Sequence, residues 1–129
     1  MKKLVSLIKS MHHQNDAKIV FREKEKFLDK TYSQVYKEAI SFATALKAYG
    51  INEGDFIAIH GSNSYYWMIA DFACILLGSI SVALYPTASR SRMQSAIADM
   101  SIPILISDDN QYLNTCKERT ACKVISLLP

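Results

Sequence analysis

The chain has 129 residues, of which half are hydrophobic and 21% are charged. A chain of this length can bury roughly two-thirds of its unfolded surface, so residues 1–129 are expected to form a single globular domain, which excludes an intrinsically disordered protein. The net charge is +3 and the basic residues are dispersed along the chain, which excludes the concentrated Lys and Arg patch of a nucleic-acid-binding protein.

The first thirty residues predict a helix followed by a small hairpin. Residues 3–12 have the period of an amphipathic helix, but their apolar stretch is too short for a secretory signal peptide. The apolar side chains share one helical face: Leu4, Leu7, Ile8 and Met11. Residues 18–22 and 26–29 are short strand candidates on either side of a charged turn.

A second helix is predicted to begin after Thr31. Thr31 and Gln34 fit the capping box, in which each side chain binds a backbone N–H at the open end of the helix. Apolar residues then recur every three or four positions and predict one buried face: Val35, Ala39, Phe42, Ala43 and Leu46. Gly50 stands where a left-handed residue is expected to end the helix.

From this point strands and helices alternate. The predicted strands are 56–59, 80–84, 103–106 and 123–127, and the predicted helices between them are 64–77, 90–100 and 109–118. The longest apolar run, residues 65–84, is interrupted by a charge, a glycine and serines, so no membrane span is predicted. Short apolar strands separated by helices predict an α/β fold with a parallel sheet that carries helices on its faces.

The order and spacing of several motifs resemble the start of the adenylate-forming acyl-CoA synthetases. Residues 31–35 (TYSQV) resemble the first core motif of that family, and residues 50–59 (GINEGDFIAI) resemble its turn into a strand. Residues 62–67 (SNSYYW) and 73–86 (ACILLGSISVALYP) resemble two further segments. Residues 84–89 (LYPTAS), where the last of these segments ends, are similar to the sequence found there in the long-chain fatty acyl-CoA synthetase branch of the family.

The resemblance implies that residues 1–129 form a single partial domain, the start of the family's large N-terminal domain, and contain only part of what the family's reaction needs. Family members adenylate a carboxylic acid with ATP and then transfer the acyl group to a thiol, so ATP, magnesium and coenzyme A are implied for the complete enzyme. The family's Ser/Thr/Gly-rich phosphate loop has no counterpart here, because the four glycines are scattered at Gly50, Gly54, Gly61 and Gly78. The later Thr-Glu motif, the ribose-binding Asp and the catalytic Lys are missing too. We therefore assign no catalytic, cofactor-binding or metal-binding residue to this chain.

Three polar residues outside the motifs follow two of the predicted strands. His60 is in the position of a general base, but no partnered Ser or Cys can be identified, so a structural role is favoured. Asp108 and Asp109 resemble the acidic pair of phospho-receiver domains, but that pair follows the first strand of its fold and this one follows the third strand of the alternating series.

The remaining candidates are cysteines and basic residues. The cysteines have neither zinc nor disulfide spacing and predict reduced thiols in a cytoplasmic protein: Cys74, Cys116 and Cys122. Three basic residues are interpreted as solvent-exposed side chains on the surfaces of the predicted helices: Arg90, Arg92 and Lys117.

Two hypotheses follow from these observations. In the first, the chain is the N-terminal part of a truncated or split fatty acyl-CoA synthetase and is inactive alone, and the missing remainder is either lost or supplied by a second polypeptide. In the second, it is a non-enzymatic module that keeps part of the fold for binding. Because a piece of the family's N-terminal domain would expose surface that the rest of the enzyme normally covers, we expect an exposed strand edge and an apolar patch, and hence self-association or a partner.

Overall fold

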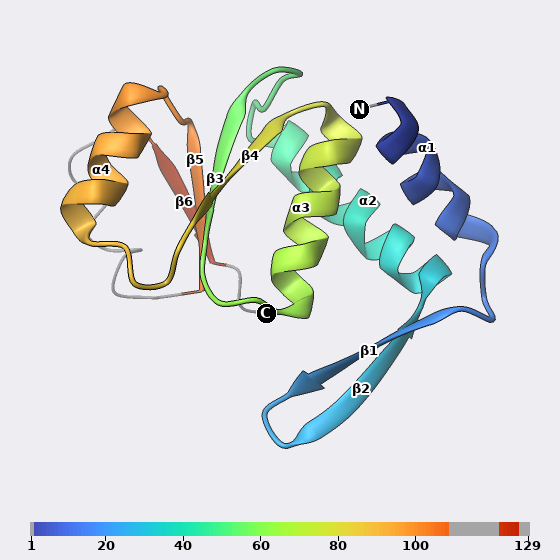
Figure 1. Cartoon of the computed structure of the whole chain (residues 1–129). Helices are drawn as coiled ribbons and strands as arrows, with labels where there is room; N and C mark the ends of the chain where they lie inside the picture. Colours follow the sequence, from blue (N-terminus) through green and yellow to red (C-terminus); the bar gives the residue numbers. More distant parts are fainter. Residues whose placement is uncertain (1, 109–121, 127–129) are drawn as a thin grey trace.

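The computed structural model describes residues 2–108 and 122–126 and shows the predicted α/β fold (Figure 1). Its helices are α1 (Lys2–Ser10), the 3-10 turn η1 (Met11–His13), α2 (Tyr32–Ala48), α3 (Tyr65–Leu77) and α4 (Arg90–Asp99). Its strands are β1 (Lys18–Glu23), β2 (Lys26–Thr31), β3 (Phe56–His60), β4 (Ile80–Leu84), β5 (Ile104–Ser107) and β6 (Lys123–Ser126). The predicted helix 109–118 lies outside the described residues.

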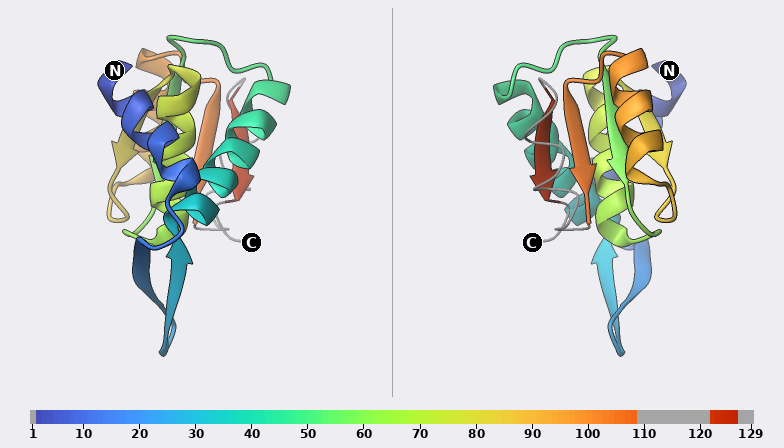
Figure 2. Two further views of the ribbon diagram at one scale, coloured as in Figure 1. Left: turned by 90° about the vertical axis from the view of Figure 1, so that its right-hand side faces the viewer. Right: turned by 90° about the vertical axis from the view of Figure 1, so that its left-hand side faces the viewer.

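The four later strands form one parallel sheet, as predicted. Their order is β4-β3-β5-β6, and β1 pairs with β2 in a separate antiparallel hairpin. Figure 2 shows α4 on one side of the sheet and α2 and α3 on the other, so the body has three layers. The hairpin projects away from these layers.

Side chains alternate between the two faces of the sheet, as the strand period of two requires. On one face the sheet packs against α2 and α3 through Ile57, Ile59, Ile104, Ile106, Ala73 and Leu46. On the other face it packs against α4 through Ala58, Leu105, Met93 and Ile97. The central strands are therefore buried on both faces, which explains why their sequences are continuous runs of apolar residues.

The predicted apolar face of the N-terminal helix is only partly covered. Ile8 and Met11 are buried, whereas Leu4 and Leu7 remain 47% and 63% exposed. Helical spacing shows which side chains share a face, but not whether another part of the chain packs against each of them.

The hairpin is attached to α3 through aromatic side chains. The ring of Phe21 stacks on that of Tyr65 with 4.5 Å between centroids, and the hydroxyl of Tyr65 donates to Glu38 of α2. The hydroxyl of Tyr66 donates to Glu23 at 3.2 Å. These contacts join one face of the hairpin to the helical layer.

The predicted capping box at the start of α2 is confirmed. The Gln34 N–H donates to Thr31 Oγ1 at 3.1 Å, and the Thr31 N–H donates to Gln34 Oε1 at 2.9 Å. At the other end of the helix Gly50 has a φ of +95°, as its position predicted.

Thr31→Ala is expected to lower the free energy of unfolding by about 1 kcal/mol, because it leaves a backbone N–H of the first turn without its acceptor. Urea denaturation followed by circular dichroism measures the change. Thr44→Ala is the matched control, since the Thr44 hydroxyl binds a backbone carbonyl inside the same helix and caps nothing. An equal loss from both variants would contradict the capping role of Thr31.

The strand next to β3 at the sheet edge is less covered than the central strands. In β4, Ile80 is 44% exposed and Ala83 is also exposed, whereas all four residues of β5 are buried. This matches the expectation of an exposed strand edge. Within the described part of the chain, no helix is long and apolar enough to cross a membrane.

Candidate functional site at the carboxyl edge of the sheet

The parallel strands bring their carboxyl ends to one edge of the sheet. These ends are His60, Leu84, Ser107 and Ser126. The connection from β3 leads to β4 on one side, and the strand on the other side of β3, β5, is followed by β6 further out. The chain therefore changes direction between β3 and β5, the type of position where ligands bind in open α/β sheets.

The crevice between the carboxyl ends of β3 and β5 is occupied by the side-chain carboxylate of Asp108. The Ser62 N–H donates to Asp108 Oδ2 at 3.0 Å, and the Asp108 N–H donates to the carbonyl of His60 at 3.2 Å. Gly61 has a φ of +151°, and a Cβ added there would lie 2.6 Å from Asp108 Cγ. Asp108 thus ties the loop after β3 to the end of β5, in what we call the Asp108 clamp. Asp109, its partner in the receiver-like interpretation, lies outside the described residues.

His60 lies beneath this edge and is only 1% exposed. Its Nδ1 is 2.8 Å from Ser107 Oγ, and the two residues are register partners on neighbouring strands. A general base must reach a substrate proton, which this buried ring does not do in the described structure. Its position supports the structural interpretation.

A shallow hollow of about 410 Å³ opens beside the clamp. It is lined by Gly61, Ser62, Asn63, Trp67, Ala83, Leu84, Tyr85 and Pro86. The motif at residues 62–67 and the motif at 84–89 therefore meet in space, although the sequence separates them. Trp67 is half-buried: it packs against the core and also forms part of the wall of this hollow, on the side of the sheet where β4 is the last described strand.

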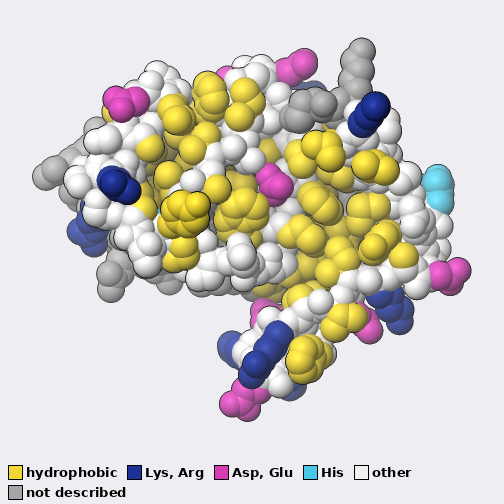
Figure 3. Space-filling view, in the orientation of Figure 1, with side chains coloured by type: hydrophobic (Ala, Val, Ile, Leu, Met, Phe, Trp, Pro, Cys, Tyr) yellow, Lys and Arg dark blue, Asp and Glu magenta, His cyan; other side chains and the backbone are white. Residues whose placement is uncertain are grey.

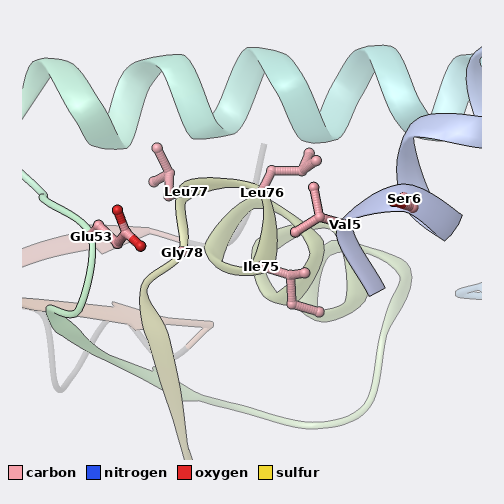
Figure 4. A pocket seen from close by; sticks show the side chains of 7 residues that line it. All are labelled: Val5, Ser6, Glu53, Ile75, Leu76, Leu77 and Gly78. Atoms are coloured by element: carbon pink, nitrogen blue, oxygen red, sulfur yellow. The ribbon is translucent and has the colours of Figure 1, made fainter. Parts of the chain in front are cut away.

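A second hollow, of about 450 Å³, lies between α1 and the end of α3 (Figure 4). Its lining is Val5, Ser6, Glu53, Ile75, Leu76, Leu77 and Gly78. Glu53 is the one charged residue of this set, and the lining of the first hollow carries no charge. Neither lining offers the positive charge that holds a polyphosphate.

Among the described cysteines, Cys74 is deeply buried and Cys122 is buried too, and both are reduced. Burial in α3 raises the pKa of Cys74 from its usual 9.0 to about 12. Burial also raises the pKa of the Tyr66 hydroxyl, with the neighbouring Glu23 carboxylate adding to the effect. Cys116 and Lys117 lie outside the described residues, whereas Arg90 and Arg92 are exposed on α4, as predicted.

Cys74 is expected to resist alkylation in the folded chain, because the thiolate is the reactive form. At pH 8 its thiolate fraction is about a thousandfold lower than in the unfolded chain, as a pKa near 12 rather than 9.0 requires. Its burial therefore contributes stability that is complete below pH 9 and is lost as the pH rises towards 12. Iodoacetamide labelling with peptide mass mapping tests this, and equal labelling rates with and without urea would contradict it.

The Asp108 clamp was not predicted from the sequence. Its only sequence signal is a glycine directly after one strand and an aspartate directly after another. Those two positions become neighbours only when β3 and β5 pair in register.

Comparison with known proteins gives one consistent result. A family model described as "AMP-binding enzyme" matches residues 9–128. The long chain acyl-CoA synthetase 5 of Arabidopsis thaliana is 30% identical over 98 residues, which are 74% of this chain and 15% of that protein. A probable CoA ligase, CCL6, of Humulus lupulus is 32% identical over 81 residues, which are 63% of this chain and 12% of that protein.

Solved structures show the same fold. The fatty acid AMP ligase of Legionella pneumophila matches 96% of this chain and 23% of its own, with a TM-score of 0.79 and 22% identity. The N-terminal subdomain of Klebsiella oxytoca NpsA matches 97% of this chain and 30% of its own, with a TM-score of 0.74 and 18% identity. The chain thus spans less than a third of each of these proteins.

Proposed function

Since the chain belongs to the AMP-binding enzyme family, we propose that it is the N-terminal part of an ATP-dependent long-chain fatty acid–CoA ligase of the cytoplasm. One observation carries the proposal: the family model matches residues 9–128, while the chain spans only 12% and 15% of two ligase relatives. The long-chain preference is supported by relatives named long chain acyl-CoA synthetases, from Arabidopsis thaliana, and by the sequence of residues 84–89.

In this proposal residues 1–129 form part of the enzyme's structural framework and contribute no catalytic residues. ATP, magnesium and coenzyme A would serve the complete enzyme, which activates the fatty acid as an acyl-adenylate before thioester formation. The two hollows described above lack cationic side chains, and the crevice between β3 and β5 holds the Asp108 carboxylate, which would repel a phosphate. We therefore propose that residues 1–129 do not form acyl-adenylate on their own.

The test is an ATP–pyrophosphate exchange assay on the purified chain with magnesium and palmitate. The expected rate equals that of the heat-denatured chain. Palmitate-dependent exchange above that background would contradict the proposal that the chain is inactive alone. A longer polypeptide from the same gene region that carries the phosphate loop is expected to restore exchange.

The second candidate is a non-enzymatic binding module, favoured by the hollow that Trp67 lines. Trp67 is the one tryptophan of the chain, so its fluorescence reports directly on that hollow. Saturable quenching by palmitate or adenosine, together with no exchange activity even in the longer polypeptide, would favour the module over the ligase.

A further inference from the structure

The face of the molecule that carries α1, α3 and β4 is unusually apolar for a surface. Figure 3 shows hydrophobic side chains spread across this face, with most of the charged side chains near its margin. Its apolar members include half-exposed residues of α3 and exposed residues of α1 and β4: Trp67, Ile75, Leu4, Leu7 and Ile80. An exposed apolar surface of this extent marks an interaction site.

The open edge of β4 restricts which partner can bind this face, because its backbone groups need hydrogen-bond partners. Among the described residues β4 pairs only with β3, so its other edge has no strand beside it. Natural edge strands are usually protected by charged side chains, proline or a bulge. The sequence of β4, ISVAL, has no charge and no proline, and its pairing with β3 is continuous in register.

The carboxylate of Asp71 lies next to β4. Asp71 projects from α3, and its Oδ1 accepts a hydrogen bond from the Ser81 hydroxyl of β4 at 2.7 Å. Trp67 and Ile75, one helical turn to either side of Asp71, are apolar. A carboxylate covered by a partner needs a cation or further donors, because its desolvation is otherwise costly.

We propose that β4 and Asp71 together dock an extended polypeptide strand that pairs with the open edge of β4 and places a Lys or Arg side chain against Asp71. The inference relies on the proposed function for the source of the strand, which would be a part of the ligase outside residues 1–129. Its chemistry follows from this chain alone: backbone groups for β4, apolar side chains for α3 and one cation for Asp71.

Other occupants satisfy fewer of these requirements. A second copy paired edge to edge about a twofold axis would place both Asp71 carboxylates on the same face of the joint sheet, where like charges repel. A lipid surface would bury the open backbone edge of β4 without hydrogen-bond partners, which is costly. A polypeptide strand meets both the backbone and the charge requirement.

The test uses two short blocked peptides of alternating valine and threonine, one with a central arginine and one with a central glutamate. Binding is followed by Trp67 fluorescence and by the amide chemical shifts of residues 80–84. The arginine peptide is expected to bind about tenfold more tightly, which corresponds to about 1.4 kcal/mol. Asp71→Asn should abolish this preference, because asparagine keeps the shape and loses the charge.

Asp99→Asn is the matched control, since it removes an exposed carboxylate at the end of α4 and should leave the preference intact. Equal affinity for the two peptides, a preference that survives Asp71→Asn, or no binding of either peptide would overturn the proposal. Concentration-dependent dimerisation with shifts at residues 80–84 and no peptide present would overturn it in favour of a second copy. None of these outcomes depends on ATP–pyrophosphate exchange, so the docking and the proposed function fail separately.

Discussion

Ile106→Ala is expected to lower the free energy of unfolding by about 3 kcal/mol. Ile106 is fully buried in β5, where it packs in one cluster with Ile57 and Ile59 of the neighbouring strand and with residues of α2 and α3. Removing three carbon atoms from this position leaves a cavity that a parallel sheet flanked by helices cannot collapse to fill. Because small domains are stable by only about 5–15 kcal/mol, the change is a large part of the total.

Ile80→Ala is the matched control for this prediction. It makes the same chemical change on a strand of the same sheet, but Ile80 is 44% exposed at the edge. We expect a loss of no more than about 1 kcal/mol, since much of its surface already meets water. Urea denaturation of the two variants measures both values, and equal losses would show that β5 is not the centre of the core.

Gly61→Ala is expected to destabilise the chain by about 3 kcal/mol, because backbone strain adds to a steric conflict. The φ of +151° is one that residues with a Cβ rarely adopt, and the added Cβ would lie 2.6 Å from Asp108 Cγ. Asp108 must move to admit it, and its hydrogen bond from the Ser62 N–H would then be lost. Amide exchange at Ser62 should therefore become faster.

Two variants separate these causes. Gly50→Ala also places a side chain at positive φ, but its added Cβ would meet nothing within 4 Å, so only a strain cost of about 1 kcal/mol is expected. In Gly61→Ala with Asp108→Ala the steric conflict is removed, and the combined loss should be smaller than the sum of the single losses. Additive losses would mean that Asp108 does not limit the space at Gly61.

The sequence alone determined the local elements. The capping box of Thr31 and Gln34, the positive φ of Gly50 and the apolar runs of β3 and β5 were all predicted, because each depends on residues that are neighbours along the chain or one helical turn apart. The parallel sheet also followed, since strands separated by helices have few other ways to pack. The family resemblance used the same local motifs, and the match over residues 9–128 confirmed it.

Only the tertiary structure decided which of these elements meet. The order β4-β3-β5-β6 makes β4 an edge strand, leaves Trp67 half-buried and places Asp71 beside Ser81. The same order brings Asp108 to Gly61 across the β3–β5 pair. The periodicity of a segment specifies which face is apolar, but strand order depends on contacts between residues far apart in the chain, and those carry no signal within any one segment.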